Sequence, residues 1–207
     1  MSRTKQIGIL VAFAAAFVGV SYLAHLYEPE IAAIVNGGGA AGVVGFVVLT
    51  AVFVIFVIPL DLVFLVPLGA VVWGPVPTAL MSIAGWTLGA AVAFGIARLF
   101  GARVVERLIG LKRVRAVESR IPKHHLFGSV ILLRMMVSVD ILSYALGLFS
   151  TMPWGLYIIA TAIGVTPFGF YFAFAGVLPM WYQVAAVGGA LALATLVFLK
   201  YGIQREP

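Results

Sequence analysis

Long apolar stretches with very few charges constrain most strongly how this chain folds. A helix needs about 20 apolar residues to cross a hydrocarbon core of about 30 Å. Stretches of this kind cover residues 7–26, 77–99, 154–177 and 183–199. Because 63% of the 207 residues are apolar and only 10% are charged, a charged, water-facing surface cannot be assembled. The sequence therefore predicts an all-α integral membrane protein in which residues 1–207 form one polytopic domain.

The first apolar stretch follows Arg3 and Lys5, as the apolar region of a secretory signal peptide also does. It is long enough to cross a bilayer, and no clear small-residue cleavage site precedes Glu28. We therefore expect an uncleaved first span, with a signal peptide as the alternative.

Residues 40–73 form an apolar region that Pro59 and Asp61 interrupt. Lys and Arg next to membrane spans are retained in the cytoplasm, so the N-terminus and residues 98–123, which hold eight of the 13 Lys and Arg, are both expected inside. Residues 40–73 must then enter and leave on the outer face. Because residues 62–73 are short for a span, we predict a re-entrant hairpin with Pro59 and Asp61 at its tip.

Residues 126–150 form a second such region, with Arg134 and Asp140 inside it. If the terminal Lys200 and Arg205 are cytoplasmic, this region is a second re-entrant hairpin, which enters from the cytoplasmic face. A single span that carries both charged residues is the alternative. Both chain ends are predicted to be cytoplasmic.

The two regions belong to an internal repeat, about residues 40–100 and about residues 126–178. The matching pairs are Asp61 with Asp140, Gly85 with Gly164 and, with one residue of slip, Leu68-Gly69 with Leu146-Gly147. The first two pairs are each separated by 79 residues. With the topology above, the fold is an inverted repeat of a re-entrant helical hairpin plus a transmembrane helix, with flanking transmembrane helices. Many secondary transporters share this architecture and bind substrate between the halves.

Three ionisable side chains are expected deep in the bilayer: Asp61, Arg134 and Asp140. A buried charge there costs about 2.5 kcal/mol or more, so each needs a partner or water. Arg134 is permanently charged, and we expect it to pair with one carboxylate while the other takes and releases a proton. Its guanidinium also suits the bidentate binding of a phosphate. An ion pair that only locks the two hairpins together is the alternative.

Other polar and small residues are candidates for helix breaks or for a polar path. Those expected at breaks or close approaches are Pro59, Gly69, Gly85, Gly147, Gly164 and Pro167, and those expected along a polar path are Ser138, Ser143, Tyr144 and Thr166. Simple helix packing is the alternative for the glycines, and bonds within one helix are the alternative for Ser and Thr. Residues 98–123 alternate basic and apolar side chains, which predicts one amphipathic helix on the cytoplasmic surface.

Several functional classes have no support in the sequence. The net charge of +6 comes mainly from one basic segment, which argues for a membrane surface and against nucleic acid. There are no cysteines, and the three histidines lack the spacing of metal ligands. No nucleophile lies near a base, and no phosphate-binding loop is present. We expect neither an enzyme nor a bound cofactor or metal.

Four segments resemble the DedA superfamily, also called SNARE-associated or VTT-domain membrane proteins, and within it the Golgi-vesicle-protein-like branch. They are LGAVVWG at residues 68–74, SIAGWTLGAAVAF at 82–94, followed by Arg98 and Gly101, then LLRMMVSVDILSYALGL at 132–148, and ATAIGVTPFGFYFAFAG at 160–176. The resemblance covers about residues 57–176 and implies a core over residues 40–178 with two re-entrant hairpins. Where the family usually carries prolines after the arginine, Val137 and Val139 stand here.

The resemblance also implies a function. Better understood relatives move polyprenyl phosphates or phospholipids between leaflets, some of them with a proton gradient. We therefore expect a lipid translocase in a plasma (inner) membrane, with membrane lipids that carry anionic headgroups, and possible protons, as its partners. A secondary transporter of a small ion or solute, or a non-transporting scaffold, is the alternative.

Overall fold

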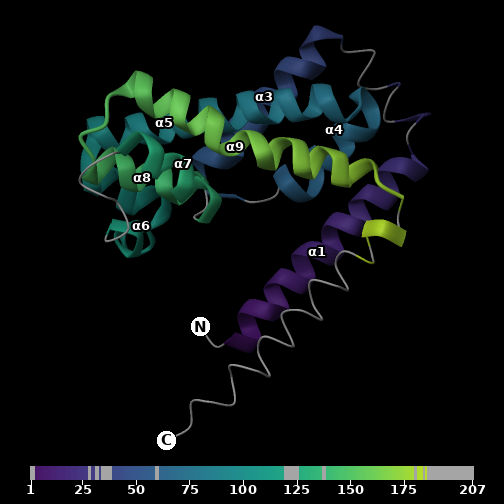
Figure 1. The fold of residues 1–207 in the computed structure, drawn as a ribbon, viewed down its shortest axis with the longest axis horizontal. Helices are drawn as coiled ribbons and strands as arrows, with labels where there is room; N and C mark the ends of the chain where they lie inside the picture. The colour runs from purple at the N-terminus through teal and green to yellow at the C-terminus, as the bar shows by residue number, and fades with distance from the viewer. Residues whose placement is uncertain are drawn as a thin grey trace, which may run out of the picture.

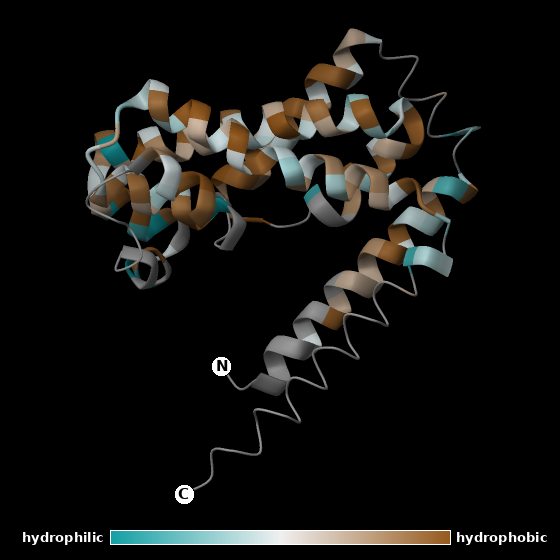
Figure 2. Cartoon of the chain, in the orientation of Figure 1, coloured by the Kyte–Doolittle hydropathy of each residue, from teal (hydrophilic) through white to brown (hydrophobic). Residues whose placement is uncertain are grey.

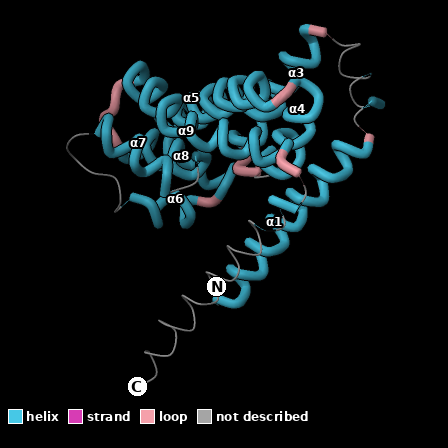
Figure 3. Tube along the Cα trace, turned by 45° about the vertical axis from the view of Figure 1, so that its right-hand side comes forward, coloured by secondary structure: helices cyan, strands magenta, loops and turns pink. Residues whose placement is uncertain are grey.

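A computed structural model describes residues 3–27, 29–30, 33, 39–58, 61–118, 126–136, 139–179, 181–183 and 185. Within these residues every regular element is a helix (Figure 3). They are α1 (Arg3–Leu26), α3 (Ala40–Ile55), the π-helix η1 (Asp61–Leu65), α4 (Val66–Trp73), α5 (Pro75–Ile109), α6 (Leu111–Glu118), α7 (Leu126–Met136), α8 (Val139–Phe149) and α9 (Trp154–Val177). The all-α prediction is confirmed for this part of the chain.

Two long apolar helices, α5 and α9, run through the centre of the molecule (Figure 1). Among the described residues, these are the two helices with enough length and hydropathy to cross a membrane. Hydrophobic residues run along both helices (Figure 2). Residues 154–177 match their predicted span, whereas residues 183–199 lie largely outside the described part of the chain.

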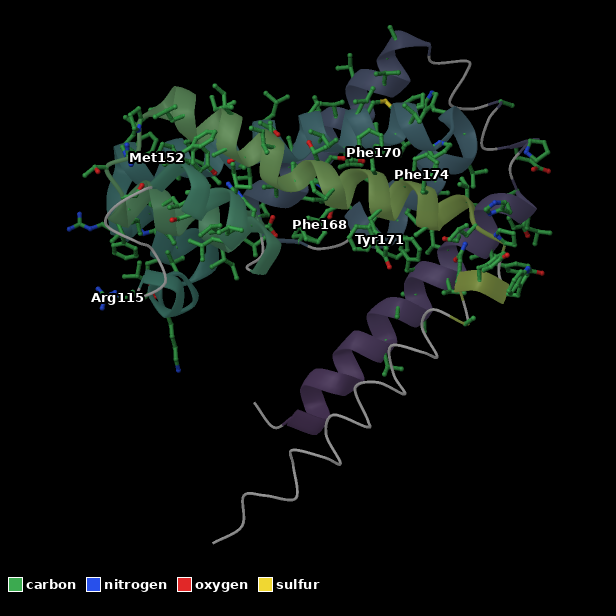
Figure 4. All side chains as sticks on the ribbon, viewed as in Figure 1. Arg115, Met152, Phe168, Phe170, Tyr171 and Phe174 are labelled. Carbon is green, nitrogen blue, oxygen red and sulfur yellow. The ribbon has the colours of Figure 1, made fainter. Side chains whose placement is uncertain are left out.

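The helices α5 and α9 pack antiparallel. A Cβ atom added at Gly169 of α9 would lie 2.7 Å from Ile83 Cγ1, and one added at Gly95 of α5 would lie 2.5 Å from the Trp154 ring. Both glycines therefore let the two backbones approach closely, as small residues do in membrane helix pairs. Figure 4 shows Phe170 and Phe174 on one side of α9 and Phe168 and Tyr171 on the other. The helix thus presents large apolar side chains in several directions.

The order of elements repeats along the chain. The series α3, η1 with α4, and α5 is followed by the series α7, α8 and α9. The long helices of the two series begin at Pro75 and Trp154, which are 79 residues apart, the same offset that separates Asp61 from Asp140. Residues 59–60 and 137–138, where each hairpin is predicted to turn, lie outside the described residues.

Contacts between the two series are reciprocal. Gly147 of α8 packs against Phe94 and Ala97 of α5, so the short helix of the second series touches the long helix of the first. Gly176 of α9 packs against Pro67 of α4, which is the converse contact. Shifting the first contact by 79 residues gives the second to within a residue, and reciprocity of this kind is what a two-fold relation produces.

Several of the helices are shorter than a bilayer. At 1.5 Å per residue, the 8 residues of α4 extend about 12 Å and the 11 residues of α8 about 16 Å, against a core of about 30 Å. Arg134 Nη1 of α7 donates to Ser143 Oγ of α8 at 3.2 Å. Nine residues of straight helix rise about 13 Å, which exceeds what the two side chains can bridge. The hydrogen bond therefore places α8 beside α7 and not in line with it.

The basic segment differs from its prediction. The helix α5 continues to Ile109, ten residues past the predicted end of the span, and changes direction at Gly101, whose φ is 71°. Gly110, with a φ of 81°, then ends it before α6. The single surface helix predicted over residues 98–123 is therefore wrong, because two glycines in left-handed conformations divide it. Arg115 of α6 extends away from the molecule (Figure 4).

The first helix, α1, agrees with the predicted first helical stretch. It contacts η1, α4 and α9, and Phe17 packs against Phe172 with ring centroids 6.2 Å apart. Its N-terminal half extends away from the other helices (Figure 1). One end of the molecule is therefore formed by α1, η1 and α4, and the other by α6 and the ends of α5 and α8.

Candidate functional site

The guanidinium of Arg134 lies at the junction of α7, α8 and α9, with the side chain only 3% exposed. It donates hydrogen bonds to Ser143 Oγ at 3.2 Å, to Tyr157 OH at 2.7 Å and to Thr161 Oγ1 at 2.8 Å. These three hydroxyls are neutral acceptors that orient the guanidinium. A fixed positive charge therefore sits inside the helix bundle, where it acts at a lower dielectric constant than water.

Tyr157 connects this charge to α5. Its hydroxyl accepts from Arg134 and donates to the carbonyl oxygen of Ala90 at 3.1 Å. Its ring stacks on Phe94 with centroids 4.0 Å apart, and the Arg134 guanidinium carbon lies 5.5 Å from the ring centre. The side chain is fully buried. Tyr157 thus positions the guanidinium by a hydrogen bond, by a cation–π contact and by its own packing.

Asp61 lies in the π-helix η1 and is 5% exposed. The indole nitrogen of Trp86 in α5 donates a hydrogen bond to Asp61 Oδ2. A π-helical segment widens the helix by one residue per turn and is frequent at functional sites. The irregular backbone at the start of η1 therefore carries a carboxylate, and α5 supplies a donor that fixes its position.

The two charged groups are attached to neighbouring turns of α5. Trp86, which holds Asp61, and Ala90, whose carbonyl holds Tyr157, are four residues apart and lie on the same face of the helix. Four residues of helix rise about 6 Å. The structure therefore gathers a carboxylate from the first series and a guanidinium from the second along one short stretch of α5.

Asp140 lies in the first turn of α8 and is partly exposed. Four residues later, the buried Tyr144 donates a hydrogen bond to the carbonyl oxygen of Ile55 at 2.6 Å. Ile55 ends α3, whose last carbonyls have no partner within the helix. Tyr144 therefore joins α8 to the end of α3. The pairing of Arg134 with one of the two carboxylates stays a prediction.

The glycines predicted at close approaches all lie in tight contacts. An added Cβ would meet Arg134 Cβ at 2.9 Å for Gly164, Thr50 Cβ at 2.7 Å for Gly85 and the Phe46 ring at 2.9 Å for Gly69. At Gly147 it would lie 2.5 Å from the Phe94 carbonyl oxygen. Gly164 is the one that touches the charged site, because its missing side chain makes room for the Arg134 stem.

The remaining predicted residues contribute less to this arrangement. Thr166 bonds the carbonyl oxygen of Ala162 in its own helix at 2.7 Å, and Pro167 lies inside α9. Pro59 and Ser138 lie outside the described residues. Within the described part, no group of three or more His, Cys, Asp or Glu residues could hold a metal ion.

Arg98 is a second arginine with a large set of partners. Its guanidinium donates to the carbonyl oxygens of Ser150 at 2.6 Å and Met152 at 2.9 Å, and more weakly to Leu146 and Gly147. Its carbon lies 4.4 Å from the centre of the Phe94 ring. These carbonyls belong to the end of α8 and the connection to α9, so Arg98 caps α8 and fixes it against α5.

The comparisons with known proteins decide the family. A family model, the VTT domain, matches residues 58–178, which is more than half of the chain. The chain belongs to the VTT-domain family. Neither the curated proteins nor the solved structures gave a match. The predicted DedA superfamily is confirmed, and the Golgi-vesicle-protein-like branch stays a prediction.

The VTT domain contains the whole arrangement around α5, from η1 to α9. VTT domains are associated with membrane transport or lipid-related function. Together with the apolar α5 and α9, the match supports a membrane protein. Trp86, Tyr157 and Thr161 of the domain were not singled out as site residues by the sequence. One signal was available, because Tyr157 and Thr161 stand 79 residues after the hydroxyl residues Thr78 and Ser82.

Proposed function

We propose that this VTT-domain protein is a lipid translocase, which moves a lipid with a phosphate-bearing headgroup between the leaflets of a plasma (inner) membrane. The observation that carries the proposal is the buried guanidinium of Arg134, which is linked through Tyr157 to Ala90 of α5, one helical turn from Trp86, which holds Asp61. Polyprenyl phosphates and phospholipids both carry the required anion. The proposal assigns no catalysis to the protein.

An inverted repeat gives the charged site access to both faces. In this proposal α3 with α4 and α7 with α8 are re-entrant hairpins from opposite faces, and both chain ends are cytoplasmic. The antiparallel packing of α5 and α9 and the reciprocal contacts of Gly147 and Gly176 support the inversion. The short lengths of α4 and α8 support hairpins that end inside the bilayer.

Binding of the headgroup uses the geometry of the guanidinium. A phosphate accepts two parallel N–H bonds from one arginine, and these charge-assisted bonds are stronger than bonds to a neutral hydroxyl. The bond from Arg134 to Ser143 is the longest of the three and joins α7 to α8. A phosphate that takes over this Nη1 group breaks the bond to Ser143, so binding loosens α8 from α7. That loosening is the step that opens the site.

The protonation state of the two carboxylates determines when the lipid headgroup binds and when it is released. Protonation of Asp61 or Asp140 removes a negative charge near the headgroup, which favours binding of the anion, and loss of the proton favours its release. A proton gradient can therefore drive the cycle. A transporter of a small ion or solute is the second candidate, because the same groups would bind a small anion.

Proteoliposomes test the proposal directly. The purified protein, reconstituted with a fluorescent phospholipid or a labelled polyprenyl phosphate in one leaflet, should exchange the label faster than empty liposomes do. Arg134→Ala should return the rate to that background. Tryptophan fluorescence and elution volume, compared with those of the parent protein, show whether the variant is folded.

Arg98→Lys serves as the matched control, because it keeps a cation at the partly buried arginine that is proposed to cap α8 without touching lipid. It should retain exchange while lowering stability. The proposal fails if neither lipid class moves faster than in empty liposomes, with or without a proton gradient. Uptake of a soluble phosphate without lipid exchange would favour the second candidate.

A further inference from the structure

Three buried hydroxyl groups near Asp61 have no hydrogen-bond partner. They belong to Thr50 of α3 and to Thr78 and Ser82 of α5, and each side chain is 0% exposed. Buried hydroxyls in proteins almost always have a partner in the protein or in ordered water. A serine or threonine in a helix usually bonds the carbonyl four residues earlier, as Thr166 does here. These three hydroxyls lack that bond, so each can still donate and accept a hydrogen bond with another group.

The three hydroxyls lie on a line that ends at Asp61. Thr78, Ser82 and Trp86 follow each other at intervals of four residues and therefore share one face of α5. Trp86 donates its hydrogen bond to Asp61. Thr50 packs against Gly85, next to Trp86, since a Cβ at Gly85 would lie 2.7 Å from Thr50 Cβ. The line starts in the first turn of α5, where the Thr78 amide donates to the carbonyl oxygen of Gly74.

The spacing of these hydroxyls fits single bridging waters. Four residues of helix rise about 6 Å, and two O–H···O hydrogen bonds in series span about 5.6 Å. One water would bridge Thr78 and Ser82. A second water would bridge Ser82 to Thr50 and Asp61 and complete a chain of hydrogen bonds. Each water would have two or more polar partners, as buried waters require.

In the second half of the molecule, the hydroxyls equivalent to those of Thr78 and Ser82 do have a hydrogen-bond partner. Tyr157 and Thr161 stand 79 residues after Thr78 and Ser82, and their hydroxyls hold the guanidinium of Arg134. The residue 79 positions before Arg134 is Ile55, which has no polar side chain. The hydroxyls in the second half therefore accept hydrogen bonds from a charged side chain, whereas the equivalent hydroxyls in the first half have no side-chain donor.

We propose that Thr78, Ser82 and Thr50 form a hydrated proton path from the N-terminal end of α5 to Asp61. Each oxygen accepts a proton from one neighbour and releases one to the next, so one O–H bond forms as another breaks. The last proton binds the carboxylate oxygen of Asp61, whose charge changes from −1 to 0. This inference rests on the proposed function, because it supplies the entry route for the coupling proton.

Few other charged groups compete for this proton. Within the described residues, η1 packs against α1, α3 and α4, and Trp86 of α5 also contacts Asp61, while the charged residues of α5 begin at Arg98, twelve residues after Trp86. Neither α3 nor α4 contains a titratable side chain, and α1 carries Arg3 and Lys5 at its start and Tyr22 and His25 near its end. The ring nitrogen Nδ1 of His25 lies 2.7 Å from the Ser21 carbonyl oxygen, and His25 is exposed. Asp61 is thus the acid at the inner end of the path.

Exchange of a thiol proton for deuterium tests whether water reaches the path. The chain has no cysteine, so Ser82→Cys or Thr78→Cys introduces one S–H group, whose stretching band is isolated in the infrared spectrum. In proteoliposomes transferred to D2O, both bands should shift to the S–D position quickly. Ala79→Cys and Ala93→Cys are matched controls on α5, because both positions are also 0% exposed but are apolar. Their thiols should exchange much more slowly.

The proposal is overturned if the Ser82→Cys and Thr78→Cys thiols exchange no faster than those controls. A second measurement uses Thr78→Val, which keeps the shape of the side chain and removes its hydroxyl. Stimulation of lipid exchange by a proton gradient should be lost, while exchange without a gradient continues. Unchanged stimulation would also overturn the path. Absence of lipid exchange in the parent protein counts against the proposed function alone, because thiol exchange does not depend on transport.

Discussion

The two halves of the VTT domain use the same arrangement of helices to hold opposite charges. In the first half the indole of Trp86 holds the carboxylate of Asp61, and in the second half the hydroxyls of Tyr157 and Thr161 hold the guanidinium of Arg134. One charge can be neutralised by a proton, and the other is permanent. Under the proposed function, this difference assigns the substrate group to the second half and the coupling group to the first.

Removing the permanent charge should have the largest effect. Arg134→Met keeps a long side chain but leaves the hydroxyls of Ser143, Tyr157 and Thr161 without their charged donor. We expect lipid exchange to fall to background and the protein to lose about 3 kcal/mol or more of its unfolding free energy in mixed micelles. Arg134→Lys should restore part of both. Normal exchange in the Met variant would show that the charge does not bind the headgroup.

Adding one methyl group at the equivalent glycines should separate packing from function. Gly85→Ala presses on Thr50 and on the backbone of α3, and Gly164→Ala presses on the stem of Arg134. Each should cost about 1–3 kcal/mol in unfolding free energy. Exchange per folded molecule should fall several-fold for Gly164→Ala and little for Gly85→Ala. Equal losses of exchange would contradict the assignment of the headgroup site to the second half.

Removing the hydrogen-bonding group of the aromatic residue next to each charge should give smaller, distinct effects on lipid exchange. Tyr157→Phe keeps the ring stacked on Phe94 and loses the hydroxyl next to Arg134, at a cost of about 1–2 kcal/mol in unfolding free energy. Trp86→Phe removes the donor to Asp61. We expect Tyr157→Phe to slow exchange at any gradient and Trp86→Phe to alter mainly the response to a gradient. Rates measured with and without an imposed gradient distinguish them.

Thr166→Val should have the smallest effect. Its hydroxyl bonds only its own helix among the contacts described, at a position outside both charged sites. A change within about 0.5 kcal/mol in unfolding free energy and unaltered exchange are expected. A large loss of exchange would place Thr166 on the substrate path that the sequence predicted for it.

Local patterns predicted the long helices, but not the partners of the charges. The start of α9 was predictable because Pro153 and the charge-free run from Trp154 mark it. Conversely, α5 continues past residue 99 because Gly101 redirects the helix and does not end it. Buried Val105 then packs the extension against the core. That burial depends on distant residues, which hydropathy along the chain does not report.

The sequence predicted the charged residues of the site but not the residues that hold them in place. Asp61 and Arg134 stand out because ionisable side chains are rare in apolar stretches. Trp86 is 25 residues from Asp61, and Tyr157 and Thr161 are 23 and 27 residues from Arg134, so only the packing of α5 and α9 brings these groups together. A hydroxyl in a span more often bonds its own helix, and for that reason Tyr157 and Thr161 gave no signal on their own.

The inversion of the two halves is the claim on which the whole account depends, and the sidedness of two equivalent positions tests it most directly. Val76 and Gly155 stand 79 residues apart, each in the first turn of its long helix and each exposed. The chain has no cysteine of its own, so Val76→Cys and Gly155→Cys can each be labelled with a membrane-impermeant thiol reagent in oriented vesicles. The account predicts that Val76→Cys reacts only from outside and Gly155→Cys only from inside. Labelling of both from the same side would contradict it.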